Sequence, residues 1–384
     1  MEHYFSSISF SFKVLKIFGL WRTNKERYSY KVYRMFFICV FFMFYLGSIF
    51  VSALTVSTVD EFFSEILYIA LTEIVMAFKT CAGFFKFYTI KQLHQQTHST
   101  DFKPLNAKER KIFDKSITRI NRYFWLLLCS TCTVWFNLLA LFSGQFKLPM
   151  FPWMLGIPYG RHLPYNFYFL AVYQTTGMFL HAFINIIHDI QVCYLLEAGS
   201  IQLMLLEERF STTQSKQTGR HNHRKLYIKY MEHFVKITNF VKQVESVWSK
   251  AIFSQFCASG ITICAISFRL SSLNFAQDFP NALTSLLYLI LMMNQIFMPC
   301  YFGNEVTLKS ARLTHALYSS EWIKMNAPER KEIQMMMIRS MKPIVLKAGG
   351  FFYYNVGMFT STLNTAYSLF CVLQRRVSST RGEM

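Results

Sequence analysis

Six small or polar side chains near the carboxyl end of the chain recur at the spacing of a helix. They are Gly357, Ser361, Asn364, Ser368, Cys371 and Arg375. Alternating steps of four and three residues place all six on one helix face. Such a face either packs closely against another helix in a membrane or lines a water-filled path for ions. One helix cannot enclose a path, so the second possibility requires several chains around a common axis.

Ionisable side chains inside or beside apolar runs form a second group with possible chemistry. Glu73 and Lys79 fall in the run 66–85, and His188 and Asp189 adjoin at the end of the run 165–187. We expect Glu73 either to bind a ligand or to pair with a neighbouring helix, and Lys79 to extend toward the membrane surface. The His188–Asp189 pair is interpreted as a polar helix end rather than as a proton relay.

Aromatic and polar side chains in four apolar runs predict a pocket for a small apolar molecule. The candidate ligand-binding residues are Tyr68, Thr72, Glu73, Trp135, Phe136, Asn137, Leu139, Tyr168, Tyr173 and Tyr288. The loop 144–164 contains four prolines and several aromatic residues, which suits a stiff lid over such a pocket. Thr72 and Asn137 would orient a volatile or lipid-like molecule. Ordinary packing between helices and against lipid is the alternative for most of these residues.

Enzyme motifs are missing from the sequence. There is no phosphate-binding glycine loop, no nucleophile elbow and no pair of metal-ligand motifs. Cys129 and Cys132 form a C-x-x-C, but they lie in an apolar run without a second pair, which favours packing over a metal or redox site. We therefore expect no enzymatic activity, no metal and no cofactor.

The elements that position these residues follow from the composition. Of 384 residues, 53% are hydrophobic, 18% are aromatic and only 16% are charged, whereas soluble domains carry about 25% charged residues. The 41 Phe residues exceed what one soluble core of this size can bury. The composition predicts an all-α, polytopic membrane protein. The net charge of +19 is then explained by basic loops rather than by binding to nucleic acid.

Seven apolar runs are long enough to cross a bilayer, which takes about 20 residues of helix. They cover 35–56, 66–85, 123–143, 165–187, 251–268, 282–303 and 348–374. The shorter run 195–206 is expected to continue the fourth span as a helix in the cytosol. The first run is too long for a signal peptide and is expected to stay as an anchor.

The basic residues predict the orientation. Of the 40 Lys and Arg residues, 31 fall on one side of the seven runs and 5 on the other. The positive-inside rule places the amino terminus in the cytosol and the carboxyl terminus outside. The expected divisions are a cytosolic segment (1–34), six spans with an outer pocket and cytosolic extensions (35–303), a cytosolic subunit-contact region (304–346), the last helix (347–374) and an outside tail (375–384).

Several motifs cluster in the last quarter of the chain. They are Ala316, Tyr318 and Trp322, then Lys342 and Pro343, then the run Lys347, Ala348, Gly349, Gly350 and Phe351, and finally Thr365, Ala366, Tyr367 and Ser368. In this order they resemble the carboxyl-terminal signature of insect odorant receptors. The length, the seven spans and the cytosolic amino terminus are similar to that family over the whole chain.

The resemblance implies a tetrameric, ligand-gated, non-selective cation channel in the plasma membrane of olfactory sensory neurons. This chain looks like a subunit that binds small volatile odorants and assembles with a shared co-receptor. It lacks the long insertion between the fourth and fifth spans that marks the co-receptor itself. The resemblance places subunit contacts at Tyr318, Trp322 and 327–341, the pore on the last span and the pocket in the outer half. It favours the pore interpretation of the polar face.

One departure from the family pattern concerns the pore. Cys371 and Arg375 stand where the family has a hydrophobic gate, and Arg375 and Arg376 would repel cations. A homotetramer is therefore expected to conduct poorly, and a complex with co-receptor subunits to conduct better.

Three alternative functions stay open at this point. A gustatory-type receptor of the same scaffold would conduct without a co-receptor. A G-protein-coupled receptor would have its amino terminus outside, and the sequence lacks the Asp-Arg-Tyr and Asn-Pro-x-x-Tyr motifs of that class. A transporter would show repeated halves or interrupted helices in corresponding places.

Overall fold

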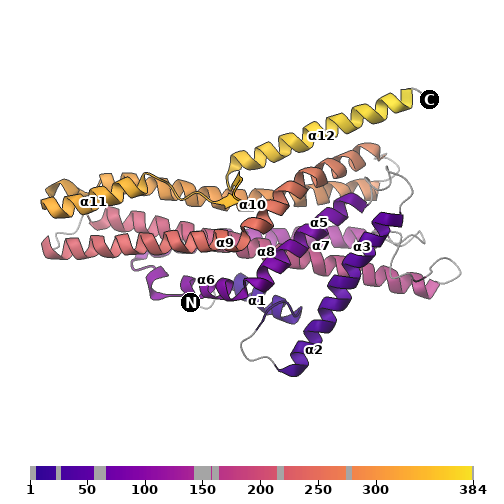
Figure 1. Ribbon diagram of the computed structural model, residues 1–384, viewed down its shortest axis with the longest axis horizontal. Helices are drawn as coiled ribbons and strands as arrows, with labels where there is room; N and C mark the ends of the chain where they lie inside the picture. Colours follow the sequence, from indigo (N-terminus) through magenta and orange to yellow (C-terminus); the bar gives the residue numbers. More distant parts are fainter. Residues whose placement is uncertain are drawn as a thin grey trace.

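The computed structural model describes residues 6–22, 27–55, 66–141, 157, 164–213, 220–273 and 279–382. Nearly all of them are helical, and the helices are arranged along one long axis (Figure 1). In chain order the elements are α1 (Ser6–Ile17), α2 (Tyr28–Phe37), the π-helical segment η2 (Ile38–Met43), α3 (Phe44–Thr55), α5 (Leu67–Phe85), α6 (Phe87–Thr97), the short helix η4 (Thr100–Phe102), α7 (Ala107–Leu141), α8 (Pro164–Thr213), α9 (Arg220–Ser272), α10 (Phe279–Tyr318), the short helix η5 (Glu321–Lys324), α11 (Ala327–Ser340), β1 (Lys347–Ala348), β2 (Phe352–Tyr353) and α12 (Val356–Gly382).

Six helical stretches in the described ranges are long and apolar enough to cross a membrane. They are Tyr28–Thr55, Leu67–Phe85, Tyr165–Ser211, Arg224–Ser271, Phe279–Tyr318 and Val356–Arg375. The third expected span lies in α7 and runs past the last described residue of that helix. These helices confirm the prediction of an all-α, polytopic membrane protein.

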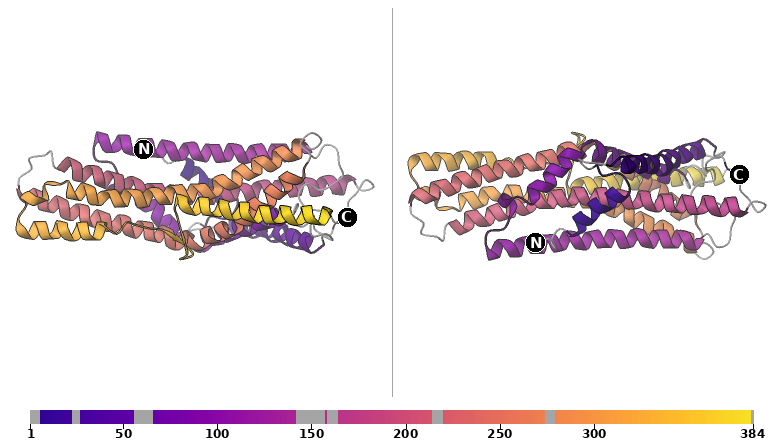
Figure 2. Two further views of the ribbon diagram at one scale, coloured as in Figure 1. Left: turned by 90° about the horizontal axis from the view of Figure 1, so that it is seen from above. Right: turned by 90° about the horizontal axis from the view of Figure 1, so that it is seen from below.

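Three helices continue far beyond a bilayer. α8, α9 and α10 contain 50, 53 and 40 residues, so at 1.5 Å per residue they are about 60–80 Å long. The run 195–206 continues α8 without a break, as expected from the sequence. The carboxyl-terminal half of α8 packs with α9, α10 and α11 into one bundle (Figure 2), whose core includes Leu203, Phe240 and Trp248.

The expected bounds of the last helix are wrong at both ends. β1 and β2 pair as an antiparallel hairpin, with Lys347 opposite Tyr353, and α12 begins only at Val356. Gly349 and Gly350 adopt φ values of +61° and +83°, which ordinary side chains disfavour, so the chain turns back here instead of starting a helix. At the other end α12 continues to Gly382 through the expected tail.

The hairpin is fixed to α9 by hydrogen bonds. The Gly349 amide donates to the Ser249 hydroxyl (2.8 Å), and that hydroxyl donates to the Lys347 carbonyl (2.8 Å). The Lys347 amide donates to the Glu245 carboxylate at 2.9 Å. A side chain at Gly349 would meet the ring of Phe253 at 2.6 Å, so this glycine is needed for the close approach. The hairpin thus sets where α12 starts relative to α9.

The first span packs closely on α8. Tyr45 of α3 is fully buried, and its hydroxyl donates to the Gln174 carbonyl at 3.2 Å. Its ring lies against Gly177, where an added Cβ would come within 2.4 Å of a ring carbon. Gly47, two residues further along α3, faces open space instead. These two glycines therefore offer a matched test of this contact.

We predict that Gly177→Ala separates the first span from α8 and lowers the free energy of unfolding by about 1–3 kcal/mol, the usual cost of overpacking. Gly47→Ala should leave stability unchanged or raise it slightly, because alanine favours helix. Thermal unfolding of both variants in detergent checks this. Equal melting temperatures for the two variants would contradict the close contact.

A buried histidine lies in the first, polar half of α9, 18 residues before the apolar run 251–268 that is expected to cross the membrane. His233 is 6% exposed and packs edge-on against Phe102, with ring centroids 5.8 Å apart. Burial is the main cause that lowers the pKa of His233 from 6.5 to about 4. The nearby Arg209 also lowers the pKa, and Asp101 raises it by a smaller amount. The side chain is therefore neutral in the folded protein at neutral pH.

We predict that stability falls as the pH falls from about 6.5 to 4. In this window the unfolded chain binds a proton at His233 and the folded chain does not, so protonation favours unfolding. His233→Gln removes this group and should flatten the dependence of the melting temperature on pH. A variant with the same slope as the wild type would show that other groups carry the effect.

Candidate functional site

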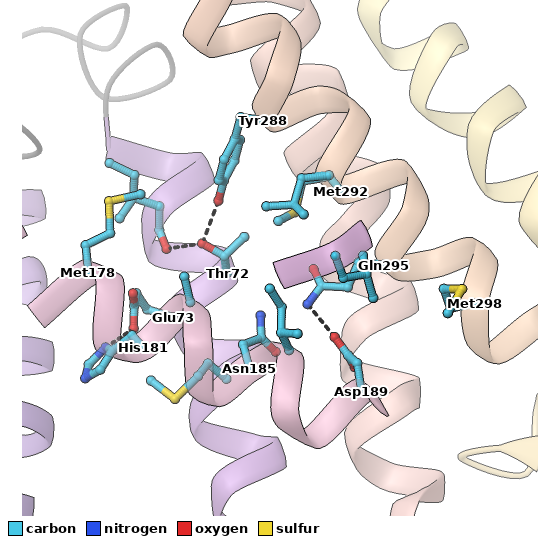
Figure 3. Close-up of a pocket in the computed structure, with 16 residues that line it drawn as sticks. Thr72, Glu73, Met178, His181, Asn185, Asp189, Tyr288, Met292, Gln295 and Met298 are labelled. Carbon is cyan, nitrogen blue, oxygen red and sulfur yellow. Dashed lines mark hydrogen bonds and ion pairs between the residues drawn. The ribbon is translucent and has the colours of Figure 1, made fainter. Parts of the chain in front are cut away.

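A cavity of about 50 Å³ lies between α5, α7, α8 and α10 (Figure 3). A buried water needs roughly 10–15 Å³ on this scale, so the space corresponds to roughly three to five waters. Its walls are mainly apolar and include Met76, Met178, Met292 and Met298. Methionine side chains are flexible and adapt to irregular shapes, so the cavity can adjust to a small apolar guest.

One end of the cavity brings predicted residues together. The Tyr288 hydroxyl of α10 donates to Thr72 Oγ1 of α5 at 3.1 Å (Figure 3), and Thr72 Oγ1 donates to the Ile69 carbonyl at 2.8 Å. The Tyr68 ring packs edge-on against Tyr288 at 5.6 Å, and the Tyr68 hydroxyl accepts a hydrogen bond from Arg269. Thr72 and Tyr288 line the cavity, and Tyr68 supports Tyr288 from behind.

Glu73 also lines the cavity and pairs with a neighbouring helix. Its Oε2 lies 2.5 Å from Nδ1 of His181 on α8. His181 Nε2 lies 2.5 Å from the Phe41 carbonyl of η2, so one imidazole joins three helices. The sequence left two roles open for Glu73, ligand binding or pairing with a neighbouring helix. The structure shows the pairing with α8, and Glu73 also lines the cavity.

The expectation for Lys79 is wrong. Its side chain is 1% exposed and its ammonium group lies 2.5 Å from Asp189 and 2.8 Å from the Asn185 amide oxygen. A buried ammonium without a counter-charge would be far less stable than this pair. The carboxylate of Asp189 therefore keeps the Lys79 side chain inside the bundle. Asp189 is likewise not a polar helix end, because Gln295 of α10 donates to its other oxygen at 2.7 Å (Figure 3).

Two further predicted pocket residues, Tyr168 and Tyr173, lie away from this cavity. Tyr168 is 60% exposed on α8, and the Tyr173 hydroxyl donates to the Val40 carbonyl of η2 instead of facing the cavity. The side chains of Trp135, Phe136, Asn137 and Leu139 are outside the part of the chain that the structure describes. The structure therefore brings three of the ten candidates into one cavity.

Several lining residues were missed by reasoning from the sequence. His181, Asn185 and Asp189 follow at four-residue steps on α8, and Gln295 faces them from α10. Polar residues at this spacing in an apolar run indicate a polar stripe facing the protein interior. That pattern is the signal that could have located this wall of the cavity.

The polar face of α12 is exposed in the single chain. All six of its predicted pore residues, from Gly357 to Arg375, are exposed, whereas Thr362 and Ala366 on the other side are buried. α12 extends from the hairpin along one edge of the bundle (Figure 1), and its other side packs against α9 and α10. The polar face is therefore not packed against a helix of its own chain in the described residues.

A second exposed surface surrounds α11. Tyr318 is 70% exposed, and Trp322 is partly buried, with Nε1 donating to the Tyr318 carbonyl at 3.2 Å. Large apolar side chains at Ile323, Met335, Ile338 and Met341 are exposed beside them. Contiguous exposed apolar residues of this kind mark contacts with another protein or a membrane.

The fold and the cavity define a polytopic helical membrane protein with an internal, mostly apolar site. The family model described as "7tm Odorant receptor" matches residues 58–367, more than half of the chain. The chain belongs to this odorant receptor family, as the carboxyl-terminal motifs predicted. Members of this family are receptors rather than enzymes, and the match favours an odorant receptor over the G-protein-coupled alternative.

Individual relatives agree with this assignment. Odorant receptor 94a of Drosophila melanogaster is 24% identical over 372 residues, covering 94% of this chain and 95% of that one. Odorant receptor 33b of the same species is 26% identical and covers 77% of this chain and 78% of that one. The insect olfactory receptor OR5 from Machilis hrabei, solved in complex with eugenol, shares the fold with a TM-score of 0.84 at 18% identity, over 97% of this chain and 98% of that one.

We predict that the buried pair Lys79–Asp189 is far more sensitive to removal of one partner than an exposed pair. Lys79→Met should lower the free energy of unfolding by about 3–5 kcal/mol, because it leaves a buried charge unpaired. The double variant Lys79→Met with Asp189→Asn should recover most of this loss.

The exposed pair Lys236–Asp101 provides the control, with side chains 56% and 45% exposed. Exposed pairs contribute about 0–1 kcal/mol, so Lys236→Met should have little effect. Denaturant titration in detergent measures all three variants. Similar losses for Lys79→Met and Lys236→Met would show that the Lys79 pair is not buried in the membrane protein.

Proposed function

We propose that this chain is the odorant-binding subunit of a ligand-gated, non-selective cation channel in the plasma membrane of olfactory sensory neurons. In this proposal it crosses the membrane seven times with its amino terminus in the cytosol, and it forms a heterotetramer with a shared co-receptor. The membership in the odorant receptor family carries the proposal. The excess of Lys and Arg on one side supports the orientation.

The cavity supports binding of small volatile molecules. It is mostly apolar, and its few polar groups come from Thr72, Glu73 and Tyr288 at one end and from Asn185 and Asp189 at the other. This is the usual composition of a small-molecule site, where apolar walls provide affinity and a few polar groups provide orientation. The solved complex of OR5 from Machilis hrabei contains eugenol, a small molecule of this kind.

The exposed faces of α12 and α11 support assembly into a channel. Serine and asparagine side chains exposed on a membrane helix are costly against lipid unless they meet water or another chain. Four copies of such a helix around an axis would turn these faces inward. The apolar surface of Tyr318, Ile338 and Met341 would then form contacts between subunits away from the pore.

A path of direct contacts joins the cavity to α12. α10 carries Tyr288 and Gln295 at the cavity, and its Phe297 ring packs edge-on against Phe359 of α12 at 5.3 Å. Further along, Gly303 of α10 lies against Tyr354 just before α12. A ligand that binds more tightly to the open state than to the closed state would shift α10 and α12 toward opening.

Arg375 is exposed at the end of the polar face. In a homotetramer four such cations would surround one mouth of the pore and raise the energy of a passing cation. Replacement of some copies by co-receptor subunits would lower this barrier. The chain is therefore proposed to work in a mixed complex, which separates it from a gustatory-type receptor that conducts without a co-receptor.

We predict ligand-dependent accessibility of the polar face in the assembled channel. Cysteines introduced at Ser361, Asn364 and Ser368, with the native Cys371 replaced by serine, should react several-fold faster with a charged thiol reagent when an odorant is bound. Cysteines at Thr362 and Ala366 on the buried side serve as controls and should stay slow. Currents recorded during labelling in cells with and without the co-receptor provide the measurement.

Equal labelling of the two faces would remove the pore assignment. Odorant-evoked currents of full size without the co-receptor would instead support the gustatory-type alternative. A tag at the amino terminus that is accessible on intact cells would overturn the proposed orientation.

A further inference from the structure

The hydrogen bonds of His181 fix how many protons it shares with Glu73. Nε2 lies 2.5 Å from the Phe41 carbonyl, and a carbonyl oxygen can only accept, so Nε2 carries a proton. Nδ1 lies 2.5 Å from Glu73 Oε2, and two acceptors without a proton would repel each other at this distance. A second proton therefore lies between Nδ1 and Oε2.

The Phe41 carbonyl is available because the first span is irregular at this point. Phe41 lies in η2, where the backbone turns are wider than in an α-helix. Two successive carbonyls of this segment accept side-chain hydrogen bonds from α8, Val40 from Tyr173 and Phe41 from His181. The imidazole ring is also packed between Phe42 and Tyr45, at centroid distances of 4.8 and 4.7 Å. His181 is thus held in one orientation by three different contacts.

The Glu73–His181 pair is neutral overall. The shared proton makes it either a carboxylate with an imidazolium or a carboxylic acid with a neutral imidazole, and both descriptions have a net charge of zero. Among the described residues, only Oε2 of Glu73 has a hydrogen-bond partner. The Glu73 side chain is 8% exposed, and the residue lines the cavity (Figure 3). Its second oxygen is therefore an acceptor that faces the binding space.

We propose that Glu73, oriented by His181, selects ligands that carry a hydroxyl group on a compact apolar body over ligands of the same size that can only accept hydrogen bonds. The inference rests on the proposed function, since it names the class of molecule for the same cavity. A buried acceptor that lacks a donor is costly in both descriptions of the pair, so one contact that supplies this donor can dominate selectivity in an apolar cavity.

Electrostatics disfavour the two other simple ligand classes at Glu73. An ether or ketone would place its oxygen against Glu73 without a proton between them, which leaves two buried acceptors unsatisfied. An ammonium ion would lose its hydration shell without meeting an uncompensated negative charge, because His181 already neutralises Glu73 and Lys79 neutralises Asp189. A neutral donor such as an alcohol or a phenol satisfies the free oxygen at no such cost.

Matched ligand pairs test this preference in the complete channel. The probes are alcohols and phenols, each compared with its own methyl ether and, for the alcohols, with the ketone of the same carbon skeleton. Half-maximal concentrations are measured from currents in cells that express this chain with a co-receptor, and cells with the co-receptor alone provide the background. In the wild type the hydroxyl compound of a pair should be about tenfold more potent, as expected when a buried acceptor gains the donor that it otherwise lacks.

Two substitutions separate the carboxyl group from the cavity shape. Glu73→Gln replaces the acceptor with a neutral amide that can also donate, so the preference should fall to within about threefold. Met178→Leu changes a neighbouring wall residue at nearly constant volume and should keep the tenfold preference. Melting temperatures of both variants in detergent establish that they fold.

Failure of this inference differs from failure of the proposed function. Currents with equal potencies within each pair in the wild type, or a full preference retained in a folded Glu73→Gln variant, overturn the selectivity. If no compound opens a channel with the co-receptor, the channel proposal fails. The selectivity inference is then tested separately, by the shift in melting temperature that each compound of the same pairs causes in the purified wild-type chain. Larger shifts with the hydroxyl compounds support it, and equal shifts overturn it.

Discussion

The absence of water from the bilayer interior is the constraint on which this structure depends. A backbone carbonyl that an irregular helix leaves without its usual donor must find a new one inside the protein. η2 presents the carbonyls of Val40 and Phe41, and side chains of α8 take both. Pro299 in α10 lacks an amide hydrogen, so it frees the carbonyl of Gln295 four residues earlier, and Gln255 of α9 donates to that oxygen at 2.9 Å. Each irregular turn is therefore also a link between two helices.

The same constraint locates the cavity. α5 and α8 run in the same direction, so that Glu73 meets His181 and Lys79 meets Asp189 about two turns further along. Buried ionisable groups are held in place by their partners, and the two pairs fix the register of these helices. The cavity lies between the pairs, with α10 closing it through Tyr288 and Gln295. Rigid polar contacts at both ends and methionines along the walls combine a fixed orientation with an adaptable shape.

Much of the fold could be predicted from the sequence because hydrophobic runs decide which segments are helical and long enough to span. The continuation of α8 through 195–206 followed from the same reasoning. The bounds of α12 did not, because Gly349 and Gly350 begin a hairpin that depends on Ser249, about 100 residues away. Thr72, Glu73 and Tyr288 could be predicted as cavity residues because they are aromatic or polar side chains within apolar runs. Lys79 was expected at the membrane surface but is buried against Asp189. Its partner Asp189 is 110 residues away, and a single sequence gives no register between such distant helices.

α10 is the element in which these features meet. On the cavity side it presents Tyr288 and Gln295, and one turn beyond Gln295 the missing hydrogen bond at Pro299 makes it easier to bend than a regular helix. Phe297 contacts α12 beside this turn, and Gly303 contacts Tyr354 just after it. Pro299 therefore lies between the part of α10 that lines the cavity and the part that contacts Tyr354 at the base of α12. In the proposed channel, a ligand that alters the tilt of the first part would act on α12 through the second, without any contact between the ligand and α12 itself.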